Sequence, residues 1–206
     1  MKYVIFDFNG TIIDDVDVGV ECINELCREY LDRGPVFKEE YLHVFTFPVK
    51  DYYERIGFDF DVQDWNEVAS RWVELYRERK EEIHLYPGVE EILKKNRLSG
   101  NKNILLSASR KDILETQLEE LGIRSLFDEV WGISDIYASS KIPLIRTFME
   151  GKDPEDCLFI GDTLHDLDVA GSAGIRCVLV AKGHQAKDVL EAYCEDVVDD
   201  IREVEI

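Results

Sequence analysis

The sequence lacks several features that would point to other classes of protein. Its apolar runs are short: the first, Tyr3–Phe6, stops at Asp7, and no later run approaches the roughly 18 apolar residues of a membrane-spanning helix. The first run is also too short for the apolar core of a signal peptide. Five cysteines form an odd set without a Cys-x-x-Cys pair, which favours reduced thiols. The sequence therefore predicts a cytoplasmic protein with no membrane partner.

Positive charge is also scarce. The 206 residues include 24 Lys and Arg against 44 Asp and Glu, which gives a formal net charge of −20. Such a surface repels nucleic acid backbones and anionic lipid, so we expect no nucleic acid partner. Hydrophobic residues make up 45% of the chain, which is enough to build a folded core. No apolar surface stripe is clear enough to predict an oligomeric state.

Several short apolar runs have the character of buried parallel strands. Each is followed by small or polar residues and then by a helical pattern, which is typical of βαβ units. These features predict an α/β fold built on a doubly wound parallel sheet. The predicted strands are Tyr3–Phe6, Ile104–Leu106, Leu158–Ile160 and Val178–Val180.

Between the first two predicted strands lies a long stretch with little strand character. Apolar residues recur there at helical spacing over 16–31 and again over 65–82. The simplest organisation is an α/β core interrupted after its first strand by an inserted α-helical cap. We predict a core domain of residues 1–14 and 84–206 and a cap domain of residues 15–83.

Polar residues follow three of the predicted strands directly. They are DFNGT at 7–11, SAS at 107–109 and GDTLHD at 161–166, and Lys141 lies between the last two segments. Because ligands of parallel sheets bind beyond the carboxyl ends of the strands, we expect these groups to converge on one edge. The sequence therefore predicts a polar site there.

These motifs, in this order, resemble those of the haloacid dehalogenase-like superfamily of phosphohydrolases. The resemblance covers essentially the whole chain and is to the branch with an inserted helical cap, which includes phosphoglycolate phosphatases. It implies a Rossmann-like core and hydrolysis of a small phosphorylated metabolite. The segments that carry it are FDFNGT, ILLSAS, Lys141 and GDTLHD.

The resemblance also implies roles for individual residues. Asp7 would be the nucleophile that forms an aspartyl-phosphate, Ser107 would hydrogen-bond a phosphate oxygen, and Lys141 would offset the negative charge. The implied catalytic set is Asp7, Asn9, Ser107 and Lys141. The implied phosphate-binding set is Gly10, Thr11, Ser107, Ala108, Lys141 and Lys50.

A magnesium site is implied as well. Asp7, Asp162, Asp166 and the backbone carbonyl of Asn9 would be its ligands. The chemistry is consistent, because Mg²⁺ prefers oxygen ligands and a carboxylate that attacks a phosphate dianion needs nearby positive charge. Covalent catalysis by Asp7 then divides one difficult displacement into two easier ones.

Asn9 departs from the pattern, because phosphatases of this family usually carry a second Asp there. That Asp protonates the leaving group and later activates water, and general acid–base catalysis is commonly worth roughly 10²–10⁴-fold. We therefore expect slow hydrolysis of ordinary monoesters. Compatible explanations are substrates with good leaving groups, a phosphate-binding or regulatory role, an introduced Asp→Asn change, and deamidation of the pair Asn9-Gly10.

The predicted cap offers one further alternative. Lys50 lies about where phosphonoacetaldehyde hydrolases of this superfamily place a Schiff-base lysine, and those relatives also lack the second Asp. The plainer interpretation is a cap lysine that contacts an anionic substrate. We expect Phe45 and Phe47 to face the core and to form a compact pocket with Lys50.

Two histidines lie near the motifs. His165, within GDTLHD, is interpreted as a solvent-facing loop residue, with contact to the ligand as the alternative. His184 is interpreted as a loop histidine that could lie near the same edge. Neither is predicted to be catalytic.

Overall fold

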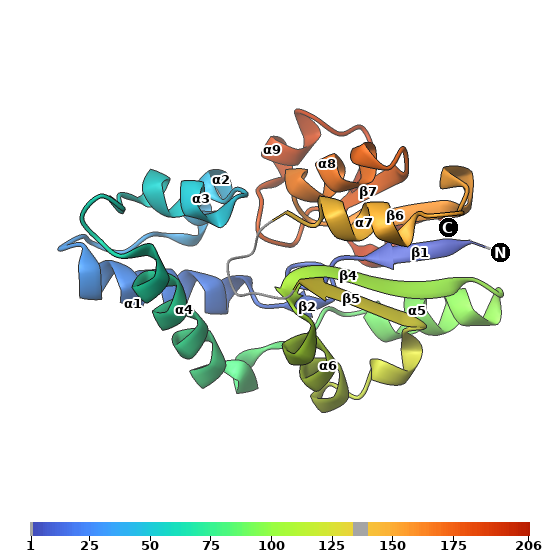
Figure 1. The fold of residues 1–206 in the computed structure, drawn as a ribbon, viewed down its shortest axis with the longest axis horizontal. Coiled ribbons are helices and arrows are strands. Elements are labelled where there is room, and N and C mark those ends of the chain that lie inside the picture. The colour runs from blue at the N-terminus through green and yellow to red at the C-terminus, as the bar shows by residue number, and fades with distance from the viewer. Residues whose placement is uncertain (1, 134–139) are drawn as a thin grey trace.

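A computed structural model of the protein describes residues 2–133 and 140–206. Its centre is a six-stranded parallel sheet with the order β5-β4-β1-β6-β7-β8 (Figure 1). The first strand is central, so the chain continues on both sides of it. The strands are β1 (Tyr3–Phe6), β4 (Lys102–Arg110), β5 (Glu129–Ile133), β6 (Cys157–Gly161), β7 (Arg176–Val180) and β8 (Val197–Val198).

All four strands expected from apolar runs are confirmed. The edge strand β5 was not expected, because Glu129–Ile133 mixes charged, aromatic and glycine positions and pairs with β4 alone. An edge strand needs fewer apolar residues than a strand that is buried between two neighbours. The five cysteines are buried free thiols, in agreement with the expectation of reduced cysteine.

Helices cover both faces of the sheet, which confirms the doubly wound α/β class. Side chains of β1 alternate between the faces: Phe6 belongs to the apolar cluster that contains Leu93, and Ile5 to the cluster that contains Val169. The helices that follow the strands are α5 (Val89–Leu98), α6 (Lys111–Glu120), α7 (Ile142–Phe148), α8 (Leu164–Ser172) and α9 (Lys187–Glu191).

The inserted region between β1 and β4 is helical and lies beyond one end of the sheet (Figure 1). The chain enters and leaves it through an antiparallel ribbon of β2 (Ile13–Asp14) and β3 (His84–Leu85). The predicted cap limits, 15 and 83, adjoin this ribbon. The region contains α1 (Val16–Tyr30), α2 (Lys38–Val44), α3 (Val49–Ile56), α4 (Trp65–Glu78) and the 3₁₀ turn η1 (Lys80–Glu82).

Two helices of this region, α2 and α3, were not expected. Both are short, and α2 buries only Tyr41, whereas α3 buries Tyr52, Tyr53 and Ile56 at a helical spacing that sequence reasoning missed. The long helices α1 and α4 were expected and pack against each other. Across residues 2–133 and 140–206, no helix combines the length and the apolar character needed to cross a membrane.

Candidate active site

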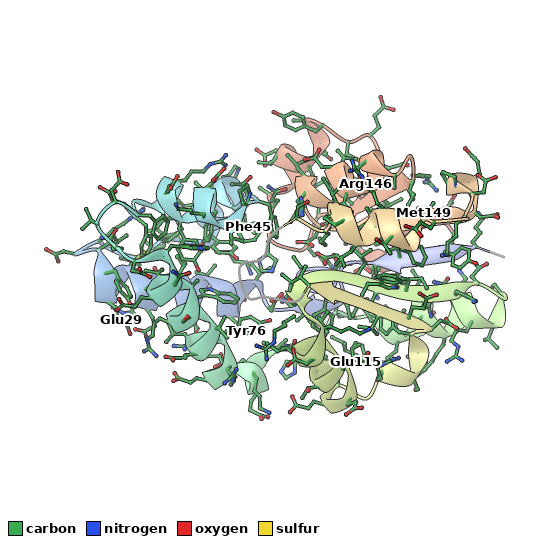
Figure 2. The ribbon with its side chains drawn as sticks, in the orientation of Figure 1. Glu29, Phe45, Tyr76, Glu115, Arg146 and Met149 are labelled. Carbon is green, nitrogen blue, oxygen red and sulfur yellow. The ribbon has the colours of Figure 1, made fainter. Side chains whose placement is uncertain are left out.

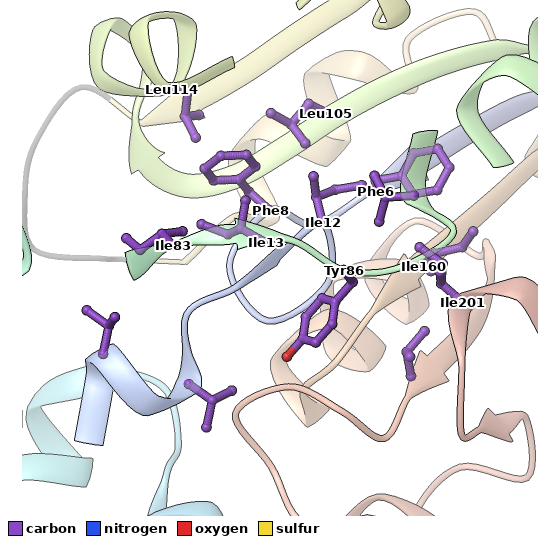
Figure 3. Close-up of a cluster of buried hydrophobic side chains, with 14 of the residues drawn as sticks. Phe6, Phe8, Ile12, Ile13, Ile83, Tyr86, Leu105, Leu114, Ile160 and Ile201 are labelled. Carbon is purple, nitrogen blue, oxygen red and sulfur yellow. The ribbon is translucent and has the colours of Figure 1, made fainter. Parts of the chain in front are cut away.

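The loop after β1 is anchored by its apolar side chains and presents its polar ones. Phe8, Ile12 and Ile13 are fully buried in the same cluster as Phe6 (Figure 3). Asp7 and Asn9 alternate with them and line a cavity between the sheet and the helical region. The motif DFNGTII therefore builds its loop through the burial of every apolar member, which turns Asp7 and Asn9 toward the cavity.

Lys141 joins two of the predicted acids. It lies just before α7, is 1% exposed, and its Nζ is 2.8 Å from Asp7 Oδ1 and 2.5 Å from Asp166 Oδ1. Burial opposes the charge of this lysine, but the two carboxylates more than compensate and raise the pKa of Lys141. A permanently positive group therefore lies beside the candidate nucleophile.

Asp162 is held rigidly at the carboxyl end of β6. Its Oδ1 accepts a hydrogen bond from Thr11 Oγ1 at 2.9 Å, and its Oδ2 accepts one from the backbone N–H of His184 at 2.7 Å. A Cβ on Gly10, whose φ is +72°, would lie 2.3 Å from Asp162 Oδ2, and one on Gly183 would lie 2.1 Å from it. Glycine at both positions lets the backbone approach this carboxylate.

Asp166 supports the loop that carries Asp162. One of its oxygens pairs with Lys141, and the other accepts hydrogen bonds from the hydroxyl of Thr163 at 2.7 Å and from its N–H at 3.1 Å. This is a capping box at the start of α8. The four-residue spacing of Asp162 and Asp166 thus lets Asp166 cap α8 and also lie in the acidic cluster with Asp162.

The acidic cluster fits a divalent cation. Oxygens of Asp7, Asp162 and Asp166 lie within 4.8 Å of one another, and all three residues are buried. Burial first, and repulsion from neighbouring acids second, raises the pKa of both Asp7 and Asp162. An all-oxygen donor set in which negative charge is penalised suits Mg²⁺.

Asn9 is bound by a complete set of partners. Its Nδ2 donates to Asp15 Oδ2 at 2.7 Å and to the Tyr76 hydroxyl at 3.0 Å, and its Oδ1 accepts from Ser109 Oγ at 3.1 Å. A carboxylate at position 9 could not donate to Asp15. The surroundings of position 9 are therefore built for an amide.

The same network bears on deamidation. That reaction needs the backbone nitrogen of Gly10 to attack the Asn9 side chain. The N–H of Gly10 already donates to Asp15 Oδ1 at 2.9 Å and to the carbonyl of Ile13 at 3.0 Å. We therefore expect the folded protein to protect Asn9 from deamidation.

Asp15 is the centre of this polar network. Besides Asn9 and Gly10, it accepts from the Tyr76 hydroxyl at 2.7 Å, and its Oδ1 lies 3.2 Å from His184 Nε2. Burial opposes its charge, but His184 and the hydrogen bonds keep the pKa of Asp15 below its usual value. Burial likewise opposes the charge of His184, whose pKa Asp15 nevertheless raises to about 9. The pair is therefore ionic at neutral pH.

The Asp15–His184 pair connects the sheet to two helices of the inserted region. His184 Nδ1 is 2.8 Å from the hydroxyl of Tyr41 on α2, and Tyr76 belongs to α4. Figure 2 shows Tyr76 and Phe45 on the side of this region that faces the sheet. Helix α2 is thus linked to the loop that carries Asn9 through His184, and helix α4 is linked to it through Tyr76.

Sequence reasoning missed Asp15, Tyr41 and Tyr76. An acid directly before a helix is ordinarily interpreted as its N-cap, but Asp15 makes no side-chain cap bond to α1. The one available signal was the missing acid at position 9 with another acid a few residues later. The tyrosines gave no signal, because they follow the apolar spacing of their helices.

His165 differs from the expectation of a loop residue that faces solvent, whereas His184 lies in a loop beside the site, as expected. His184 is 7% exposed and bound on both ring nitrogens. His165 lies in α8 and stacks on Phe47 with ring centroids 4.6 Å apart. Burial first, and Lys141 second, lowers the pKa of His165 to about 4. Tertiary packing decided both positions.

The cavity brings together some of the predicted residues and not others. Asp7, Asn9, Ser107, Ala108 and Lys141 line it. Its volume is about 850 Å³, toward the upper end of the roughly 300–1,000 Å³ typical of small-molecule sites. It is therefore larger than the compact pocket expected from the cap aromatics.

Five other predicted residues do not line the cavity, and two of them, Asp162 and Asp166, are the fully buried acids described above. Thr11 is buried behind Asp162, and the N–H of Gly10 is already engaged within the loop. Lys50 does not line the cavity, although Phe45 and Phe47 do. The Lys50 side chain is exposed, with Nζ 5.3 Å from the ring centroid of Phe60.

Comparison with known proteins agrees with this architecture. The chain belongs to the haloacid dehalogenase-like hydrolases, since the sequence profile of that family matches residues 4–180. Within the family it falls in the phosphoglycolate phosphatase-like branch, as a distant member. It is 24% identical to phosphoglycolate phosphatase of Synechococcus elongatus over 198 residues, which cover 95% of this chain and 91% of the relative. The enzyme of the same name from Pseudomonas putida is 26% identical over 211 residues, which cover 98% and 77%.

Solved structures show the same fold. A haloacid dehalogenase-like protein from Streptococcus pneumoniae superimposes with a TM-score of 0.80 at 20% identity, over 96% of this chain and 92% of that one. A predicted phosphatase from Clostridium acetobutylicum gives a TM-score of 0.79 at 21% identity, over 98% of this chain and 95% of that one. These likenesses show that the fold of this chain is shared with both structures.

Proposed function

We propose that the protein hydrolyses a small phosphorylated metabolite in a Mg²⁺-dependent reaction that passes through an aspartyl-phosphate on Asp7. One observation carries this proposal: Asp7 lines the cavity while Lys141 and two further buried acids surround it. A carboxylate with a paired lysine and a cation site is suited to attack an anionic phosphate. The phosphatases among the relatives support the same reaction class.

Each residue of the site has a proposed role in this reaction. Asp7, Asp162, Asp166 and the Asn9 carbonyl would hold Mg²⁺, which offsets negative charge on the phosphate. Lys141, paired with Asp7 and Asp166, contributes a second positive charge. Ser107 Oγ would donate to a phosphate oxygen.

In the first step a carboxylate oxygen of Asp7 forms a bond to phosphorus. The ester P–O bond breaks, and its electron pair leaves with the alcohol oxygen. That oxygen needs a proton, and the amide of Asn9 has no proton to transfer near neutral pH. We therefore propose that the leaving group takes its proton from water, so that aliphatic esters react more slowly than esters of acidic alcohols.

Two alternatives are weaker. A phosphate-binding or regulatory protein would explain Asn9, but it would not need the Lys141–Asp7 pair beside a cation site. A C–P hydrolase with a Schiff base on Lys50 would need that side chain in the cavity, and Lys50 lies against Phe60 instead.

Turnover of a panel of phosphate monoesters with Mg²⁺ tests the proposal. The parent protein should release phosphate, and Asp7→Asn should abolish release. Asp51→Asn is the matched control, because Asp51 is exposed on α3 and does not line the cavity. Release that persists in Asp7→Asn would contradict the proposed nucleophile. Tight phosphate binding with no release by the parent would favour the regulatory alternative.

A further inference from the structure

Helix α4 has one broad apolar face. Val68 and Leu75 are buried in the core of the inserted region, where α4 packs against α1. The adjoining row, Ala69, Trp72 and Tyr76, lines the cavity. Because this row borders the cavity, its side chains can contact a molecule that binds there.

Aromatic rings on this face lie half-buried beside the catalytic loop. Trp72 and Tyr76 are stacked with ring centroids 4.8 Å apart and planes at 23°. Hydrogen bonds fix Tyr76 to Asn9 and Asp15. Trp72 lies one helical turn from Tyr76, a rise of about 6 Å along α4, and lines the same cavity as Asp7.

The opposite wall of the cavity comes from α6. Ile113, Gln117 and Leu121 lie there at helical spacing. Lys80 Nζ on the helical side is paired with Glu120 Oε1 across the cavity at 2.8 Å. Outside the phosphate end, the cavity therefore combines apolar walls with a cation whose charge is already offset.

Three other basic side chains line the cavity: Arg110, Lys141 and Arg77. Arg110 is paired with Asp112 through Nε at 2.6 Å, and Lys141 serves the phosphate end. Arg77 lies at the rim and is exposed. The interior thus offers rings and aliphatic groups to the part of the substrate beyond the phosphate.

We propose that the alcohol portion of the substrate is a flat aromatic or heteroaromatic group, which stacks on Trp72 and Tyr76 while its phosphate lies at Asp7. This rests on the proposed phosphohydrolase function and specifies its substrate class. The cavity of about 850 Å³ has room for such a group, and a two-carbon acid would leave most of it empty. Stacking between rings adds specificity beyond the burial of apolar area.

Binding of non-hydrolysable phosphonates separates this proposal from the catalytic one. We would measure dissociation constants by isothermal titration calorimetry with Mg²⁺ for 2-phenylethylphosphonate, 2-cyclohexylethylphosphonate and phosphonoacetate. The first two share the phosphonate and the linker and differ in the ring, which is flat and aromatic in one and puckered and saturated in the other. We expect the phenyl compound to bind about three- to ten-fold more tightly than the cyclohexyl compound, the range typical of aromatic pairs.

Two matched variants locate the effect. Trp72→Leu should bring the ratio of the two dissociation constants close to one. Trp131→Leu should leave the ratio unchanged, because Trp131 does not line the cavity. Equal affinities in the parent protein, tighter binding of phosphonoacetate, or no measurable binding of the ring compounds would overturn the proposal. Because no phosphate is released in this experiment, these results are independent of the turnover test with Asp7→Asn.

Discussion

Replacing Asn9 with Asp should not simply restore the acid that related phosphatases carry at this position. Asn9 Nδ2 donates to Asp15 Oδ2 at 2.7 Å, and the substitution would put a second carboxylate oxygen in the place of that donor. Asp15 is held in its ionised form by His184 and Tyr76. The change therefore replaces a charge-assisted hydrogen bond with repulsion between two buried acids.

The size of the effect follows from the geometry. Two unit charges 2.7 Å apart repel by about 6 kcal/mol at an effective dielectric constant of about 20. Protonation of the introduced carboxyl avoids this repulsion, at about 1.4 kcal/mol for each pH unit above the ordinary Asp pKa of about 3.9. The protein adopts whichever of the two states costs less, and at both pH values this is the protonated carboxyl. Asn9→Asp should therefore lose about 4 kcal/mol of unfolding free energy at pH 7 and about 1.5 kcal/mol at pH 5.

The sign of the pH dependence is definite. The introduced carboxyl has a raised pKa in the folded protein, so its cost is absent below pH of about 3.9 and grows as the pH rises. Urea denaturation in EDTA at pH 5 and pH 7 measures it. The double variant Asn9→Asp with Asp15→Asn keeps one acid and one amide at this contact. Asn9→Asp should therefore cost much less stability when it is measured against Asp15→Asn than when it is measured against the parent.

Activity on an aliphatic monoester provides the second assay. Asn9→Asp alone should give no gain, whereas the double variant places an unopposed acid beside Asp7 and should gain roughly 10²–10⁴-fold. Asp15→Asn alone is the control for loss of the Asp15 charge. If Asn9→Asp alone is as stable as the parent at pH 7 and gains that full rate, the electrostatic reasoning is refuted.

Two further predictions concern the same loop. Burial opposes the charge of His184, but Asp15 raises the pKa of His184 from 6.5 to about 9. The pair therefore contributes about 3 kcal/mol to the free energy of unfolding. This contribution is complete below pH 6.5 and is lost as the pH rises through 9. Urea denaturation in EDTA from pH 6 to 10 should show this fall in the parent and not in His184→Gln. Gly10→Ala would place Cβ 2.3 Å from Asp162 Oδ2 and should cost about 1–3 kcal/mol in thermal denaturation. Gly34→Ala meets open space and should change stability by less than about 0.5 kcal/mol; equal losses in the two variants would contradict the steric argument.

The fold was predictable where short-range pattern and burial coincide. The strand Tyr3–Phe6 is apolar throughout because neighbours pair with it on both sides and helices cover both faces. The edge strand Glu129–Ile133 has a neighbour on one side only, and its mixed sequence gave no comparable signal. The short helix Lys38–Val44 escaped prediction because its one fully buried side chain, Tyr41, gives no periodicity.

Distance along the chain explains what was missed at the site. Tyr76 and Asp15 are 61 residues apart, and His184 and Asp15 are 169 apart. No local pattern reports such a pair, because contacts over that separation exist only after the helical region has packed against the sheet. The orientation of Trp72 has the same origin: helical spacing shows that it is apolar and does not show which of two walls it faces.

The sequence by itself determined the parallel sheet and the placement of Asp7, Lys141 and Asp162 around one edge of it. Strand ends and the residues that follow them are adjacent in the chain, so their chemistry can be inferred from order alone. Only the tertiary structure decided that the amide of Asn9 faces a second buried acid, Asp15, and that an aromatic face of α4 lines the cavity. Both depend on how distant segments pack, where burial sets the charge a group can hold and the neighbours it must have.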